Sequence, residues 1–246
     1  LYVRMLFLMV VSLYTSRVVL NALGIEDFGI YNVVGGMVAM FSMLSGSLSA
    51  AITRFITYEL GRGDREKLRT IFSSAVTIQL GLAAIIIILA EVLGIWFLNS
   101  KMTIPLDRLA AANWVFQFSV LTFAINLVSV PYNASIIAHE RMSAFAYISI
   151  FEAVGKLAIA YLITISPIDR LVFYAILMCA VALIVRFTYG IYCKRHFEEC
   201  MYHFIFDKNL LKDMFGFAGW NFIGASSSVL RDQGGNVVIN LFCGPA

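Results

Sequence analysis

Residues 82–98 read "LAAIIIILAEVLGIWFL", a run of apolar residues in which Glu91 carries the one charge. A strand of a membrane barrel alternates apolar and polar residues over about ten positions, and this run does not alternate. A helix needs about 20 apolar residues to span the hydrocarbon core of a bilayer. The stretch therefore predicts a transmembrane helix.

Similar apolar runs recur along the chain of 246 residues, which is 61% hydrophobic and 13% charged. Soluble domains average about 25% charged residues, and a soluble chain could not bury this much apolar surface. We expect an all-α, polytopic transmembrane helical bundle with about seven helices in this chain. The expected spans are residues 1–23, 28–58, 68–98, 109–138, 145–165, 171–192 and 210–243.

Lys and Arg are distributed unevenly between the two sides of the expected membrane. Ten lie on the side of the amino terminus, and three (Lys101, Arg108 and Arg170) lie on the other side. The ten are Arg4, Arg62, Arg65, Lys67, Arg69, Arg141, Lys194, Arg195, Lys208 and Lys212. Cytoplasmic loops carry the excess of Lys and Arg, so we expect a cytoplasmic amino terminus.

The sequence contains no Walker motif, nucleophile elbow or HExxH motif, and its four cysteines form no disulfide-like framework. Catalytic and nucleotide-binding sites of the common kinds carry such signatures. We therefore expect no enzymatic activity, no cofactor or metal site, and no nucleic-acid partner.

Two similar stretches, of eight and nine residues, end the first and the seventh expected spans. They are "RVVLNALG" at 17–24 and "NVVINLFCG" at 236–244. A repeat of six helices would keep both in the same orientation, although chance similarity between two apolar helices explains the pattern equally well. With the repeat, residues 1–206 form a six-helix lobe, and residues 207–246 are the first helix of a truncated second lobe. The missing initiator Met also favours a fragment.

Three stretches carry a resemblance to a known family. They are "RVVLNALGIEDFGIYNVVGG" at 17–36, "GSLSAAITRFITYELGRGD" at 46–64 and "VPYNASIIAHERM" at 130–142. Together they resemble the O-antigen and capsule flippases (Wzx type) of the multidrug/oligosaccharidyl-lipid/polysaccharide exporter superfamily. The likeness runs over nearly the whole chain in order and spacing.

The resemblance implies 12–14 helices in two lobes around a cavity, often cationic, that opens alternately to either side of the bacterial cytoplasmic membrane. It implies an undecaprenyl-pyrophosphate-linked oligosaccharide as cargo, an H⁺ or Na⁺ gradient as a possible drive, and other polysaccharide-assembly membrane proteins as possible partners. Three alternatives remain: a drug/cation antiporter of the same superfamily, a membrane-embedded glycan polymerase or ligase, and a non-transporting scaffold. An antiporter favours a carboxylate-lined cavity, and a polymerase usually needs a large outer loop.

Charged side chains inside the expected spans are the candidate binding residues, because a charge near the bilayer centre costs about 2.5–3.5 kcal/mol. Lys156 lies near the middle of its span, with Glu152 four residues earlier on the same helical face. These two form either a self-neutralising pair or a site for an anionic cargo group and a coupling proton. Arg17 and Arg54 either reach for the nearest headgroups or bind anionic cargo in the cavity; the resemblance favours the second.

Three further charged positions complete the candidates. Arg231 and Asp232 stand beside "QGG" in a broken-looking part of the last expected span, which should face protein or water. Arg186 lies near the cytoplasmic end of its span, where reaching for headgroups is the favoured interpretation. Glu91 is a weaker candidate for a ligand or proton role.

Overall fold

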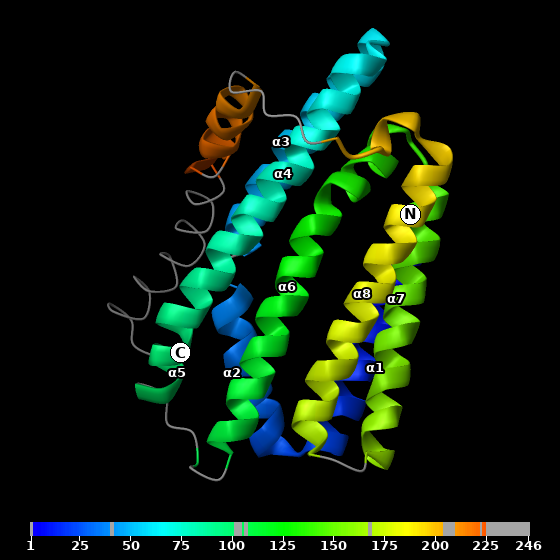
Figure 1. Cartoon of the computed structure of the whole chain (residues 1–246). Coiled ribbons are helices and arrows are strands. Elements are labelled where there is room, and N and C mark those ends of the chain that lie inside the picture. The colour runs from blue at the N-terminus through cyan, green and yellow to red at the C-terminus, as the bar shows by residue number, and fades with distance from the viewer. Residues whose placement is uncertain are drawn as a thin grey trace, which may run out of the picture.

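The chain folds into a bundle of long helices (Figure 1). The computed structural model describes residues 2–39, 42–100, 105, 108–166, 169–203, 210–221 and 223–224, and these contain no strand. The labelled helices are α1 (Tyr2–Leu23), α2 (Ile25–Ala39), α3 (Ser42–Arg62), α4 (Arg65–Leu89), α5 (Ile95–Ser100), α6 (Leu109–Ala138), α7 (Met142–Leu162) and α8 (Arg170–His196). Residues 210–221 are also helical. The expected all-α fold is confirmed.

Within the described residues, five segments are long and apolar enough to cross a membrane, and they agree with five of the expected spans. They are Arg4–Leu23, Arg65–Leu98, Leu109–Ala138, Met142–Ile165 and Arg170–His196. The second of these joins α4 to α5 through a π-helical turn at Ala90–Gly94. The chain is therefore a multi-pass membrane protein. Most of the expected span at 210–243 lies outside the described residues.

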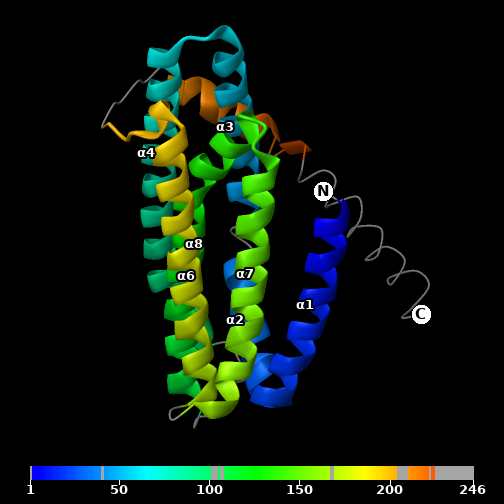
Figure 2. The same ribbon diagram turned by 90° about the vertical axis from the view of Figure 1, so that its right-hand side faces the viewer.

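The expected span at 28–58 covers most of α2 and α3, and the two residues between these helices, 40 and 41, lie outside the described residues. The sequence of α3 is rich in serine and includes Arg54, so it falls short of the hydropathy that the five spans reach. Figure 2 shows α3 near one end of the bundle and α2 near the other, so the pair together extends over its length.

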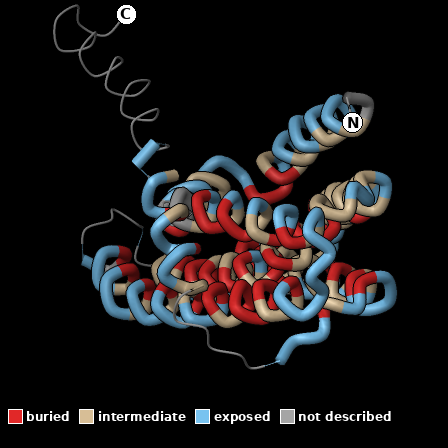
Figure 3. The backbone as a smooth tube through the Cα atoms, turned by 90° about the horizontal axis from the view of Figure 1, so that it is seen from above, coloured by how far each residue is buried: buried red, intermediate tan, exposed pale blue. Residues whose placement is uncertain are grey.

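Helix α6 lies at the centre of the bundle. It packs against α2, α3, α4 and α8, and half of its most apolar window is buried, against 17–28% for the other four spanning segments. Its buried side chains, including Phe116 and Leu127, belong to the apolar clusters that join it to its neighbours. In Figure 3, red buried positions accordingly fill the middle of the bundle and pale blue ones lie outside.

One end of the bundle collects most of the basic residues, and we call it the basic end. It holds the turn between α3 and α4, the turn between α6 and α7, and the carboxyl end of α8 (top of Figure 1). Gly63 ends α3 with a φ of 75°, which glycine adopts without strain. Asp64 then starts α4 by accepting a hydrogen bond from the Lys67 backbone at 3.0 Å, as an N-cap does.

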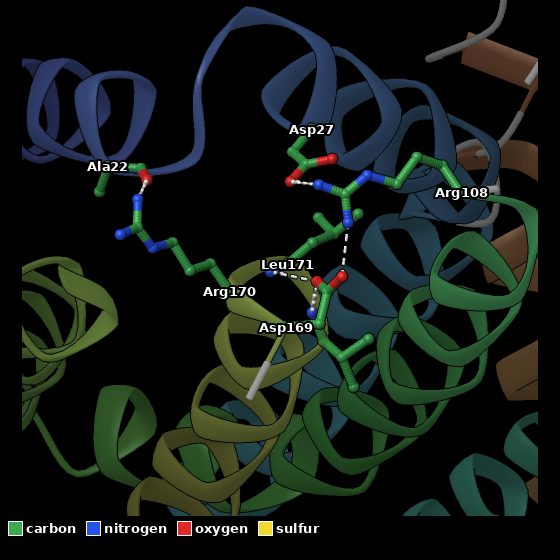
Figure 4. Close-up of polar contacts among 7 residues, drawn as sticks. Ala22, Asp27, Arg108, Asp169, Arg170 and Leu171 are labelled. Atoms are coloured by element: carbon green, nitrogen blue, oxygen red, sulfur yellow. Dashed lines mark hydrogen bonds and ion pairs between the residues drawn. The ribbon is translucent and has the colours of Figure 1, made fainter. Parts of the chain in front are cut away.

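At the opposite end, a group of five residues joins four helices (Figure 4). The Arg108 guanidinium donates to Asp27 of α2 at 3.0 Å and also to Asp169, whose carboxylate caps the start of α8. Arg170 donates to the backbone carbonyl of Ala22 in α1 at 3.2 Å. We call these five residues the clasp. Burial raises the pKa of the Asp27 carboxyl above its ordinary value of 3.8, although the Arg108 charge acts against that rise.

Candidate functional site

A polar groove lies between α1 and α7. It encloses about 500 Å³, and Tyr174 of α8 also lines it. Its polar lining residues are Arg4, Ser12, Thr15, Ser16, Ser149, Glu152 and Lys156. We call it the α1–α7 groove. At about 1.5 Å per residue, Glu152 and Lys156 lie about 15 and 21 Å along α7 from the basic end, so the groove reaches well into the membrane.

Glu152 and Lys156 form an ion pair within this groove. Their Oε1 and Nζ atoms are 2.6 Å apart, one helical turn separates the two residues, and their side chains are 36% and 42% exposed. This partial exposure means that the pair faces the groove and remains open to another ligand. The structure thus places Glu152 and Lys156 next to each other, as their spacing of four residues on one helix predicted.

Arg4 is the third charged residue of the groove. Its guanidinium donates to the Ser149 hydroxyl at 3.3 Å and lies 4.7 Å above the ring of Phe145. Its Nε is buried without a hydrogen-bond partner. Sequence reasoning assigned Arg4 to the cytoplasmic charge excess and missed this site. The signal was its place at the start of an apolar run that includes Ser12, Thr15 and Ser16.

The groove is electrostatically suited to an anion. Arg4 and Lys156 supply two cations, and Glu152 supplies one carboxylate, so the formal charge of the lining is positive. Thr15 Oγ1 is buried without a partner and adds a free hydroxyl. In a membrane, where the dielectric constant is low, one excess cation attracts an anion far more strongly than it would in water. Such a lining can donate hydrogen bonds to phosphate groups and exchange hydrogen bonds with sugar hydroxyls.

The other charged candidates lie elsewhere. Arg17 is exposed on α1 and does not line the α1–α7 groove. Arg54 is exposed on α3, and its guanidinium lies 4.3 Å above the ring of Phe217 in the 210–221 helical segment. Glu91 accepts a hydrogen bond from Gln117 at 3.1 Å. Arg231 lies outside the described residues.

Arg186 is also remote from the α1–α7 groove. Its guanidinium lies 3.8 Å above the Tyr132 ring, on the side of the bundle where α4, α6 and α8 meet. It does not join Arg4 and Lys156. Among the candidates in the described part of the chain, Glu152 and Lys156 are the two that line one cavity together.

Comparisons with known proteins give a consistent family relationship. A family model described as polysaccharide biosynthesis protein matches residues 2–246. The uncharacterized membrane protein EpsK of Bacillus subtilis (strain 168) is 22% identical over 124 residues, which are 50% of this chain and 24% of EpsK. The aligned part of the chain thus spans about a quarter of the length of that relative. No solved structure matches the chain.

Proposed function

Because this chain belongs to the polysaccharide biosynthesis protein family, we propose that the whole protein is a flippase for a lipid-linked oligosaccharide. Its cargo would be an undecaprenyl-pyrophosphate-linked sugar chain, moved from the inner to the outer leaflet of the bacterial cytoplasmic membrane. The observation that supports this most directly is the cationic α1–α7 groove, which opens a polar path within apolar, membrane-spanning helices.

Each charged residue of the groove has a role in this proposal. Arg4 lies nearest the basic end, where it would receive the pyrophosphate, and its planar guanidinium can bind two phosphate oxygens at once. Lys156 would hold the anion deeper in the membrane. Glu152 would keep Lys156 in place and, where the transport is driven by H⁺ or Na⁺, carry the proton or bind the ion.

The proposal needs a second lobe to close the cavity. We assign residues 1–206 to the first lobe and 207–246 to the first helix of the second. Arg17, Arg54 and Arg231 would then face the space between the lobes and add to its positive charge. The exposure of Arg17 and Arg54 in this chain supports that assignment. Transport would follow from one lobe rocking against the other.

A cation antiporter fits this lining less well. Such a protein needs carboxylates to outnumber cations along the path of its substrate, because a like charge repels the cargo. In the α1–α7 groove, Arg4 and Lys156 face the single carboxylate of Glu152. The charge of the groove therefore favours the flippase.

The test uses a strain that lacks the full-length gene, in which lipid-linked oligosaccharides are extracted and quantified by mass spectrometry. The gene is then returned as wild type, Arg4→Gln, Lys156→Gln or Arg195→Gln. Arg195 is the matched control because it is an exposed cation at the basic end that does not line the groove. An immunoblot of membranes confirms equal amounts of each variant.

We expect completed repeat units to accumulate in the deletion strain, and the wild type and Arg195→Gln to clear them. Arg4→Gln and Lys156→Gln should clear them at least about tenfold more slowly, which corresponds to about 1.4 kcal/mol of lost stabilisation each. A deletion strain with normal levels of these lipids and complete surface polysaccharide would refute the flippase. Full clearance by both groove variants would refute the role of the groove.

A further inference from the structure

A second groove lies on another face of the bundle, where α4, α6 and α8 run beside one another (Figure 1). It encloses about 340 Å³. We call it the α4–α6–α8 groove. Alanines form much of its lining, at positions 83, 84 and 124, and Arg186 is its single charged residue. It shares no lining residue with the α1–α7 groove.

The surroundings of this groove are those of a lipid-facing surface. Large apolar side chains of its lining stand exposed, with Leu80 46% and Leu183 39% exposed. In a protein that crosses the membrane, apolar side chains exposed in the middle of spanning helices meet lipid. The small side chains of Ala83, Ala84 and Ala124 lie among them, so the surface is hollowed there.

Arg186 lies at the margin of the α4–α6–α8 groove on the side of the basic end. Along α8 it lies ten residues before His196, which is about 15 Å, whereas Tyr132 on α6 lies about 9 Å from the same end. Because the guanidinium sits 3.8 Å above the Tyr132 ring, the side chain reaches toward the basic end. The rest of the lining, from Val128 to Ile87, lies deeper in the membrane.

The structure holds the guanidinium in this position from two sides. Tyr132 supplies an aromatic face, which attracts a cation. Gly190 leaves the space that the guanidinium occupies, because a Cβ at position 190 would lie 3.0 Å from Arg186 Nη1. None of the ion pairs found among the described residues includes Arg186. A charge at this depth needs an anion or water close by.

We propose that the α4–α6–α8 groove binds one anionic phospholipid of the leaflet at the basic end. The lipid phosphate would contact Arg186 and one acyl chain would lie along the groove. Charge complementarity selects this occupant: a guanidinium binds phosphate oxygens in pairs, and the apolar lining below it matches a hydrocarbon tail. The site is separate from the proposed transport path, so it stands or falls independently of the flippase.

The test uses the full-length protein, purified in detergent and titrated with phosphatidylglycerol or with phosphatidylcholine, and native mass spectrometry counts the bound lipids. The variants are Arg186→Gln, which removes the charge, and Ala84→Phe, which fills the groove from an exposed position. Arg195→Gln is the matched control, since it removes a cation of the same kind outside the groove.

We expect the wild type and Arg195→Gln to hold one phosphatidylglycerol at least about tenfold more tightly than phosphatidylcholine, a ratio that corresponds to about 1.4 kcal/mol. Arg186→Gln should lose this preference, and Ala84→Phe should weaken both lipids. Equal binding of the two lipids by the wild type, or an unchanged preference in Arg186→Gln, would overturn the proposal. So would preferential binding of a polyprenyl phosphate that phosphatidylglycerol cannot displace.

Discussion

At the level of single residues, the Glu152–Lys156 pair shows how a charge can be kept inside a membrane without losing its ability to bind. The two side chains neutralise each other at 2.6 Å and still face the α1–α7 groove. Removing one partner leaves the other charge uncompensated, whereas removing both leaves two neutral side chains. The pair should therefore be more sensitive to single than to double substitution.

We predict this from a double-mutant cycle. Glu152→Gln and Lys156→Met should each lower the apparent melting temperature of the detergent-solubilised protein, and the double variant should be less destabilised than the sum of the two. The expected coupling is about 0.5–1 kcal/mol, toward the low end for contacting pairs because both side chains are partly exposed. Strictly additive effects would show that the pair is not coupled.

The clasp carboxyl Asp27 gives a pH-dependent prediction. Burial raises its pKa in the folded protein above 3.8, so the folded state binds the proton more tightly than the unfolded state. The stabilisation from that proton is complete below about pH 3.9, the unfolded value, and is lost as the pH rises through the folded pKa. In Asp27→Asn this loss should be absent.

The measurement is the apparent melting temperature of wild type and Asp27→Asn from pH 4 upward. The difference, wild type minus variant, should fall with rising pH and then level off. A difference that rises instead would show that attraction to Arg108 outweighs the burial of the carboxyl.

Residue spacing predicted one part of the candidate site and not another. Glu152 and Lys156 are neighbours on a single helix, so their pairing follows from helical geometry alone. Arg4 meets Ser149 and Phe145 across two helices that are far apart in sequence. That contact depends on how α1 packs on α7, which no local pattern encodes.

At the level of the elements, the π-helical turn at Ala90–Gly94 changes the direction of side chains in the long span from Arg65 to Leu98. Such turns insert an extra residue into a helix and occur frequently at functional sites. Here the turn places Glu91 beside Gln117 of α6 and brings the backbone of Gly94 against the ring of Phe116. Close contact between α6 and this turn therefore requires a glycine.

We predict that Gly94→Ala destabilises the protein, because the added methyl group would collide with the fully packed Phe116 ring. Overpacking of this kind costs about 1–3 kcal/mol. The smaller side chain in Phe116→Leu should restore part of the loss in the double variant. Apparent melting temperatures of the four proteins measure this, and a Gly94→Ala protein as stable as the wild type would contradict the packing described here.

Hydropathy predicted the five spanning segments that the described part of the chain contains. It also predicted a span at 28–58, but α3 in that stretch is rich in serine, includes Arg54 and falls short of the hydropathy of the other five.

At the level of the whole molecule, the two ends of the bundle differ in charge. The basic end gathers Arg62, Arg65, Lys67, Arg141 and Lys194, while the opposite end holds the clasp, where cations and carboxylates are matched. This asymmetry is the one from which the orientation is predicted, with the basic end in the cytoplasm.

Labelling of single cysteines in intact cells tests the orientation. In a protein whose four native cysteines are replaced by alanine, Ile25→Cys should react with a membrane-impermeant maleimide, because Ile25 is 85% exposed near the clasp. Glu66→Cys, exposed at the basic end, should react only after the cells are opened. The reverse pattern would invert the topology and place the entrance of the α1–α7 groove outside the cell.

The clasp also means that the two ends of α1 are held by different contacts. Arg170 connects the Ala22 end of α1 to α8. The other end lies at the margin of the bundle (Figure 3), where Arg4 contacts α7 through one hydrogen bond and one aromatic ring. About 27 Å of helix separate Arg4 from Ala22. A rotation of α1 by about 10° about Ala22 would move Arg4 sideways by about 5 Å over that length. This movement would break the hydrogen bond between Arg4 and Ser149 while the contact between Arg170 and Ala22 is kept, so the groove would widen first at the basic end.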